Sequence, residues 1–217
     1  MNLNILYEDR DILVCEKPAG IATQSKRVGA PDMVSILKNH LHQSAPNQQP
    51  YLAVIHRLDQ PVTGLLVFGK TQKAAANLTQ QLTTSGFGKH YLAVLTNTPG
   101  IEEADLVDYM VKDARTNTSR ICTKDTPGAK EARLHYQIIQ KGENSSIADI
   151  TLDTGRHHQI RVQMSHIGCP IQGDKKYGAP SAGQLMLFAY RLTFRHPITG
   201  NLLSFQLDRT KLINSAI

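Results

Sequence analysis

Residues 56–68 read HRLDQPVTGLLVF and lie between two apolar stretches of the chain. Residues 51–55 have the composition of a strand, and residues 65–68 that of a buried strand. Arg57 and Asp59 therefore fall in the break between two strands. A charged side chain on such a loop can reach a cleft while the sheet holds its backbone still. The alternative is that Asp59 is a solvated loop acid, and the rest of the chain has to decide between the two.

Strand patterns outnumber helix patterns along the chain. Residues 31–42 and 71–82 carry apolar side chains at helical spacing, and Thr71 is placed to cap the second helix. Residues 134–138 and 148–152 alternate apolar and polar side chains, which predicts an antiparallel pair. Further strands are predicted at residues 5–6, 12–14, 91–95, 105–111, 119–122, 185–194 and 202–207. Because strands and helices do not alternate regularly, the pattern favours an α+β fold with a mixed, mostly antiparallel sheet flanked by helices and loops.

The bulk composition is that of an ordinary globular protein. The chain has 217 residues, of which 41% are hydrophobic and 19% charged, and it fits a single domain over residues 1–217. No stretch approaches the roughly 18 apolar residues that a membrane span needs. Three widely spaced cysteines without a CxxC pair predict reduced thiols in a cytoplasmic protein. The net charge of +6 favours a partner with a phosphate backbone.

A second segment rich in polar chemistry covers residues 153–163, DTGRHHQIRVQ, where a predicted strand turns at Gly155 into a helix. Arg156, His157, His158 and Arg161 crowd the first turns of that helix. The alternative is a solvated basic face. However, cations are unfavourable at a helix N-terminus unless an anion such as a phosphate or a carboxylate lies nearby, so the cluster favours a functional role.

Other chemical templates do not fit. The stretch GFGK at residues 86–89 lacks the Ser or Thr of a phosphate-binding P-loop, and the adjacent histidines 157 and 158 lack the spacing of a zinc site. Neither GxSxG nor GxGxxG occurs. We therefore expect no metal and no dinucleotide cofactor. Tyr91 opens a predicted strand, and from the pattern alone a packing role is the alternative to a functional one.

The chain resembles the RluA family of RNA pseudouridine synthases over most of its length. The resemblance rests on ordered segments at residues 16–20, 56–70, 89–91, 154–163, 168–174 and 185–197. The HRLD-to-GLL run and the GRxHQIR run are each specific. Departures at residues 62–63, 163 and 188 bear on target preference rather than on the nucleophile. The resemblance implies the pseudouridine synthase fold with a catalytic cleft, and a catalytic domain without the S4 domain that some relatives carry.

The resemblance also implies roles for individual residues. Asp59 would be the nucleophile that initiates breakage of the uridine N-glycosidic bond, by attack at C1′, by attack at C6 or through a glycal. Tyr91 would stack on the target uracil, Arg161 would pair with Asp59, and Arg57 would help to eject the base. The residues expected to contact RNA are His56, Arg57, Lys17, Lys89, Arg156, His158 and Lys175.

The function that the resemblance implies is isomerisation of specific uridines in structured RNA, either ribosomal or transfer RNA. The reaction exchanges one bond to C1′ for another and needs no redox equivalent, which agrees with the absence of cofactor motifs. We expect a monomer without an obligate protein partner. Two alternatives remain: an RNA-binding protein of the same fold without catalysis, and an unrelated α+β protein. The presence of Asp59, Tyr91 and Arg161 favours the enzyme over the first alternative, and the several motifs in the expected order make the second remote.

Overall fold

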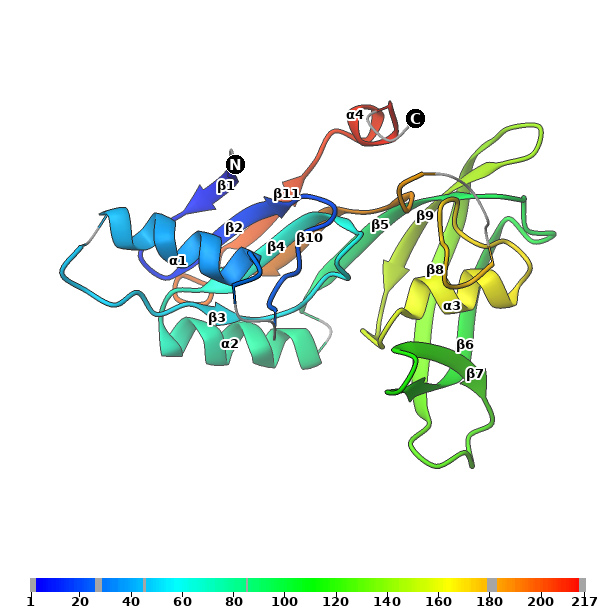
Figure 1. Ribbon diagram of the computed structural model, residues 1–217, viewed down its shortest axis with the longest axis horizontal. Coiled ribbons are helices and arrows are strands. Elements are labelled where there is room, and N and C mark those ends of the chain that lie inside the picture. The colour runs from blue at the N-terminus through cyan, green and yellow to red at the C-terminus, as the bar shows by residue number, and fades with distance from the viewer. Residues whose placement is uncertain (1–2, 26–28, 45, 85, 179–182, 215–217) are drawn as a thin grey trace. The chain divides into compact units, whose positions relative to one another are not determined.

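The structure is a computed structural model that describes residues 3–25, 29–44, 46–84, 86–178 and 183–214. It is built of strands and helices of the α+β class, which the sequence predicts (Figure 1). The chain divides into two compact units. The first consists of residues 1–88 and 189–207, and the second of residues 89–188 and 208–217. The prediction of a single domain over the whole chain stays a prediction.

The first unit is built on a sheet that combines four strands from residues 4–69 with two strands from residues 187–206. The strands are β1 (Asn4–Glu8), β2 (Ile12–Lys17), β3 (Ala53–Val54), β4 (Thr63–Gly69), β10 (Leu187–Arg195) and β11 (Leu202–Gln206). Their order is β1-β2-β4-β10, with β3 paired to β4 and β11 paired to β10. The pairs β1–β2, β2–β4, β3–β4 and β10–β11 are antiparallel. The predicted antiparallel character is therefore present in this unit.

Helix α2 (Gln72–Thr83) covers one face of this sheet. Its Ala74 and Leu78 are fully buried in a cluster with alternate residues of the strands, such as Val14 of β2 and Val67 of β4. Thr71 Oγ1 accepts a hydrogen bond from Ala74 N–H at 3.2 Å, which confirms the predicted cap. The intervening strand residues are also buried, so both faces of β2 and β4 are covered.

Helix α1 (Met33–Ser44) begins two residues later than predicted, because Asp32 serves as its cap. Asp32 Oδ1 accepts a hydrogen bond from Ser35 N–H at 2.7 Å, and Ser35 Oγ accepts one from Asp32 N–H at 3.1 Å. Two amides that a helix start leaves without partners are satisfied in this way. The predicted strand at residues 51–55 shortens to the two residues of β3, which pair with β4.

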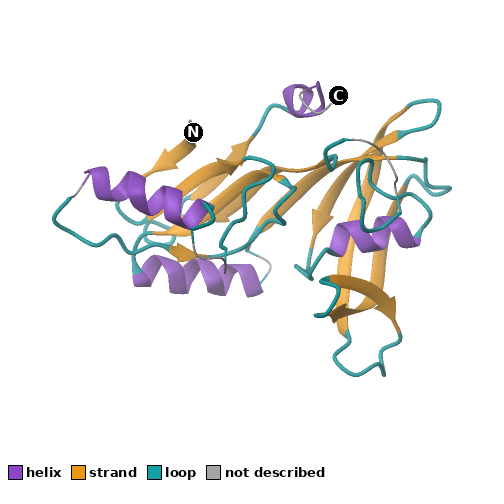
Figure 2. Cartoon of the chain, in the orientation of Figure 1, coloured by secondary structure: helices purple, strands orange, loops and turns teal. Residues whose placement is uncertain are grey.

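The second unit is an antiparallel sheet with two helices (Figure 2). Its strands are β5 (Gly88–Leu95), β6 (Glu103–Asp113), β7 (Thr118–Cys122), β8 (Lys130–Lys141) and β9 (Ser146–Leu152), in the order β5-β9-β8-β6-β7. The predicted pair at residues 134–152 is confirmed as β8–β9. The helices are α3 (Gln159–His166) and the short α4 (Arg209–Asn214). The sequence pattern does not predict α4. Among the described residues, none of the helices has the length and apolar character needed to cross a membrane.

Candidate active site

Asp59 lies in the loop between β3 and β4, where the sequence places it. The side chains alternate along this loop: Arg57 is exposed, Leu58 is buried and Asp59 is half-buried. Val62 N–H donates to Asp59 O at 3.0 Å and closes a turn before β4 starts. The loop therefore presents the carboxylate near the surface while Leu58 anchors it in the core.

Reciprocal hydrogen bonds fasten the Asp59 loop to the segment that follows β2. Thr23 Oγ1 accepts from Leu58 N–H and donates to Leu58 O, both at 3.1 Å. Gly20 N–H donates to Gln60 O at 2.9 Å, and Gln60 Nε2 donates to Gly20 O at 2.8 Å. Because these bonds lie on both sides of Asp59, the backbone that carries the carboxylate is held in one conformation.

Lys17 closes the base of the same loop. Its side chain is fully buried, and Nζ donates to the carbonyl oxygens of Pro18, Ile21 and Gln60 at 2.9, 2.7 and 3.0 Å. Burial lowers the pKa of Lys17 from 10.5 to about 8, and the negative charge of Asp59 opposes that change. The sequence predicts that Lys17 contacts RNA; the structure instead gives its ammonium group three carbonyl partners and no exposed surface.

His56 is tied to β4 through its ring. Nε2 lies 3.2 Å from Val67 N and accepts that N–H, and the ring meets Phe87 edge-on with centroids 5.6 Å apart. This environment gives His56 a structural contact in addition to the RNA contact predicted for it.

Gly64 allows the second half of the HRLD-to-GLL run to approach β10. Its φ is +147°, and a Cβ at this position would collide with the backbone of Ala189. Only glycine fits this combination of dihedral angle and contact.

Strand β5 carries Tyr91 and Lys89. Tyr91 is 7% exposed and pairs with Ile150 of β9, and Lys89 is 8% exposed. Burial lowers the pKa of Lys89, and the charge of Asp153 opposes that change. Little of Lys89 is therefore accessible to a phosphate.

Arg161 of α3 is held by Asp174, which lies in the turn after Gly173. Arg161 Nε donates to Asp174 Oδ2 and Nη2 donates to Oδ1, both at 2.8 Å, and the two side chains are 6% and 1% exposed. Lys176 N–H adds a third bond to Asp174 Oδ1 at 3.0 Å. The guanidinium also lies over the ring of Tyr177, with Cζ 5.1 Å from its centroid. These contacts fix the orientation of the Arg161 guanidinium group.

The residues before α3 do not form its first turn as predicted. His158 has φ +57°, a left-handed conformation that cannot continue a helix, so α3 begins at Gln159. Arg156 Nε donates to Glu131 O at 2.6 Å, and His158 Nδ1 lies 2.6 Å from the hydroxyl of Tyr177. The predicted basic cluster is thus distributed over a turn with partners of its own, and Lys175 remains exposed.

Comparison with known proteins gives the family. The family model described as RNA pseudouridylate synthase matches residues 11–166. The chain belongs to the RNA pseudouridylate synthase family. It is 33% identical to ribosomal large subunit pseudouridine synthase D of Nitrosomonas europaea over 94% of this chain and 61% of that protein. It is 34% identical to the protein of that name from Pasteurella multocida, over 94% and 66%. The chain thus spans less than two thirds of the length of these two relatives.

Two further likenesses agree with membership of the RNA pseudouridylate synthase family. The protein described as uncharacterized RNA pseudouridine synthase YlyB of Bacillus subtilis is 32% identical over 95% of this chain and 69% of its own length. The solved structure of human RNA pseudouridylate synthase domain containing 4 has a TM-score of 0.80 at 21% identity, over 94% of this chain and 88% of that one. The predicted pseudouridine synthase fold is confirmed.

The predicted site residues of this pseudouridylate synthase family member lie in both units. Asp59, Arg57, His56 and Lys17 belong to the first unit, and the remaining ones, Tyr91, Arg161, Lys89, Arg156, His158 and Lys175, belong to the second. The pairing of Asp59 with Arg161, and the cleft that it implies, stay predictions.

Three residues with evident importance for the site are not predicted from the sequence. Asp174 and Tyr177 set the position of Arg161, and Thr23 fastens the Asp59 loop. For Asp174, the Gly-Asp pair at residues 173–174 is a local signal, because Gly173 has φ +77° and turns the chain. No local pattern marks Thr23 or Tyr177, since their partners are distant in sequence.

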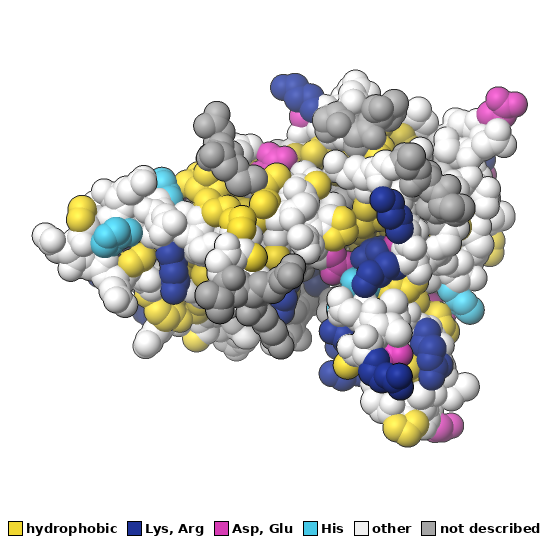
Figure 3. Space-filling model, viewed as in Figure 1, with side chains coloured by type: hydrophobic (Ala, Val, Ile, Leu, Met, Phe, Trp, Pro, Cys, Tyr) yellow, Lys and Arg dark blue, Asp and Glu magenta, His cyan; other side chains and the backbone are white. Residues whose placement is uncertain are grey.

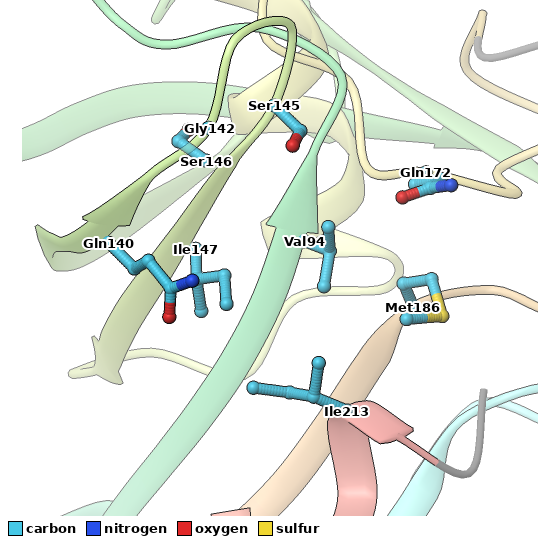
Figure 4. Close-up of a pocket in the computed structure, with 9 residues that line it drawn as sticks. All are labelled: Val94, Gln140, Gly142, Ser145, Ser146, Ile147, Gln172, Met186 and Ile213. Carbon is cyan, nitrogen blue, oxygen red and sulfur yellow. The ribbon is translucent and has the colours of Figure 1, made fainter. Parts of the chain in front are cut away.

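A pocket in the second unit contains none of the predicted residues (Figure 4). It is lined by apolar and uncharged polar residues of β5, the β8–β9 hairpin, the turn after α3, the segment just before β10, and α4: Val94, Gln140, Gly142, Ser145, Ser146, Ile147, Gln172, Met186 and Ile213. Without an acid, a base or a nucleophilic thiol in its lining, it offers nothing to uridine chemistry.

Proposed function

We propose that this protein isomerises uridine to pseudouridine in structured RNA. The observation that carries the proposal is the placement of Asp59 on a loop held on both sides by hydrogen bonds, within a chain that belongs to the RNA pseudouridylate synthase family. Relatives named for the large ribosomal subunit favour ribosomal RNA over transfer RNA as the substrate. We propose that the protein acts as a monomer in the cytoplasm, where that RNA is found.

The proposed reaction exchanges bonds within one nucleotide. Asp59 initiates breakage of the N1–C1′ bond, the uracil turns over in the site, and C5 bonds to C1′. The proton on C5 leaves to solvent and N1 gains a proton, so atoms and electrons balance without a redox partner. An aspartate nucleophile must be ionised, and neighbouring positive charge favours that form. The buried ammonium of Lys17 supplies such a charge within the first unit.

The other proposed roles follow from side-chain chemistry. An aromatic face such as Tyr91 holds an extruded base at low conformational cost. Extrusion costs a few kcal/mol, and the exposed Arg57 next to Asp59 is suited to fill the gap in the RNA stack. Arg161, already oriented by Asp174, is the proposed counter-ion of the nucleophile.

Release of tritium from RNA labelled at uridine C5 tests the proposal. The substrates are unmodified transcripts of large-subunit ribosomal RNA and of transfer RNA, each incubated with wild type and with Asp59→Asn, which keeps the side-chain shape. We expect release with wild type and none with the variant. Equal release by both would remove Asp59 from the mechanism. Binding of the transcripts without release by wild type would favour the RNA-binding alternative.

A further inference from the structure

The end of the β6–β7 hairpin and the loop after β7 carry an excess of positive charge. Residues 112–130 contain five lysine or arginine and two aspartate side chains, a net charge of +3 against +6 for the whole chain. The exposed Lys176 joins them, because its Nζ donates to Asn117 O at 2.8 Å. We call residues 112–130 with Lys176 the basic arm. Its cations, all exposed, are Lys112, Arg115, Arg120, Lys124, Lys130 and Lys176.

The positive charge of the basic arm is only partly balanced by its own carboxylates, since Arg120 interacts electrostatically with Asp113 but five lysine or arginine side chains stand against two aspartates in residues 112–130. Among the described residues, the ion pairs that lysine and arginine form with carboxylates lie outside the arm, as at Lys141 with Glu102. Asp113 is committed to the hairpin turn, where Oδ1 accepts a hydrogen bond from Arg115 N–H at 2.8 Å. Figure 3 shows lysine and arginine side chains gathered over the part of the second unit where β6 and β7 lie.

The basic arm is fixed to helix α3, which carries Arg161. Ser119 N–H donates to the hydroxyl of Tyr177 at 2.9 Å, and Ser119 Oγ lies 2.9 Å from His157 Nδ1. Tyr177 is the residue whose ring lies against the Arg161 guanidinium. Apolar contacts of Met110 and Ile121 with α3 complete the attachment. The backbone of the β6–β7 hairpin, which carries several of these cations, is therefore held against the part of the second unit that carries Arg161.

We propose that the basic arm binds the phosphate backbone of the substrate RNA. This inference rests on the proposed function and adds a binding surface to it, separate from the residues predicted to contact RNA. Exposed cations that form no ion pair with a carboxylate can bind phosphates, which releases the counter-ions condensed on the RNA. The buried Lys17 and Lys89 do not provide this gain. The arm attaches the RNA to the second unit, while the chemistry requires Asp59 of the first.

Salt-dependent binding tests the arm. The arm variant is Arg115→Gln, Arg120→Gln and Lys124→Gln together. The matched control, Arg10→Gln, Lys38→Gln and Lys73→Gln, removes the same charge from exposed positions of the first unit. Both are made in wild type and in Asp59→Asn, and the second series is titrated with an unmodified large-subunit ribosomal RNA transcript at several salt concentrations. Melting curves of all variants check that the fold is kept.

We expect the arm variant to raise Kd roughly tenfold or more near 0.15 M salt and to reduce the slope of log Kd against log salt by about 2 to 3. The control variant should leave the Kd and the salt slope close to those of the Asp59→Asn protein. In the active background, the arm variant should raise KM while kcat at saturating RNA is kept. The proposal would be overturned if the arm variant and the control lost the same RNA affinity, or if the arm variant left the slope of log Kd against log salt unchanged. If Asp59→Asn proves active, the proposed nucleophile fails while this binding result stands.

Discussion

Arg161 and Asp174 form a buried bidentate ion pair in which both nitrogen–oxygen distances are 2.8 Å. Neither side chain is more than 6% exposed. Such a pair is costly to desolvate, so its fixed bidentate geometry points to a role in orienting Arg161 rather than in stability. Asp174 acts on the proposed chemistry only through Arg161, so it is a positioning residue.

Replacing Asp174 with asparagine should leave the Arg161 charge buried without its counter-ion. We expect a loss of about 3 to 5 kcal/mol in the free energy of unfolding, measured by urea titration, and a marked fall in kcat. The exposed Glu143→Gln should change stability by no more than about 0.5 kcal/mol. The double variant Arg161→Met with Asp174→Leu should recover stability without recovering activity. An Asp174→Asn protein as stable as wild type would contradict the expectation that Asp174 compensates the buried charge of Arg161.

Lys17 should make stability depend on pH in the alkaline range. Its folded pKa of about 8 lies below the ordinary 10.5, so between these values the unfolded chain keeps a proton that the folded chain has released. The free energy of unfolding attributable to this group therefore rises with pH through that window, by up to about 3 kcal/mol. The difference between wild type and Lys17→Met, measured by denaturant titration from pH 7 to 10.5, isolates the effect. If the difference in unfolding free energy between wild type and Lys17→Met did not change with pH, the lowered pKa of Lys17 would be contradicted.

Thr23 should control how firmly the Asp59 loop is held. Thr23→Val keeps the shape but removes the hydroxyl that bonds both Leu58 N–H and Leu58 O, leaving buried polar groups unsatisfied. We expect a cost of about 1 to 3 kcal/mol in unfolding free energy. In tritium-release kinetics kcat should fall with little change in KM. Thr23→Ser, which retains the hydroxyl, should restore most of kcat; if it does not, the hydrogen bonds are not the cause.

Gly64 should not tolerate a side chain. Gly64→Ala has to place a Cβ against the Ala189 backbone at a φ of +147°, and we expect a loss of at least about 2 kcal/mol. Gly100→Ala is the control, because no atom lies near a Cβ there and its φ is not positive. Chemical denaturation of the two variants gives the comparison. Similar stability of both would mean that β4 and β10 adjust readily.

Local signals predict much of this fold. The cap at Thr71 and the alternation along β8 and β9 involve residues that are close in sequence, and both are confirmed. The position of β4 beside β10 unites residues more than a hundred positions apart, and no periodicity encodes such a pairing. Helix α4, with six residues, is too short for a periodic pattern.

The candidate site shows the same division. The sequence locates the Asp59 loop, because polar residues interrupt two apolar runs there. It does not reveal that Lys17 is buried, since a lysine beside a proline and a glycine has the composition of a solvated turn. Only the carbonyls of Pro18, Ile21 and Gln60, brought together by the fold, make burial of that ammonium group tolerable.

The first unit is interrupted in sequence by the second, and this order has a consequence for synthesis on the ribosome. Leu192 and Phe194 of β10 belong to the same hydrophobic cluster as Val14 and Val67, so that cluster stays open until residues 192–194 have been synthesised and have emerged. The second unit, nearly continuous from residue 89 to residue 188, has most of its strand partners available earlier. Domains fold as units during translation, so the nascent chain completes the basic arm before the loop that bears Asp59 has a finished sheet beneath it.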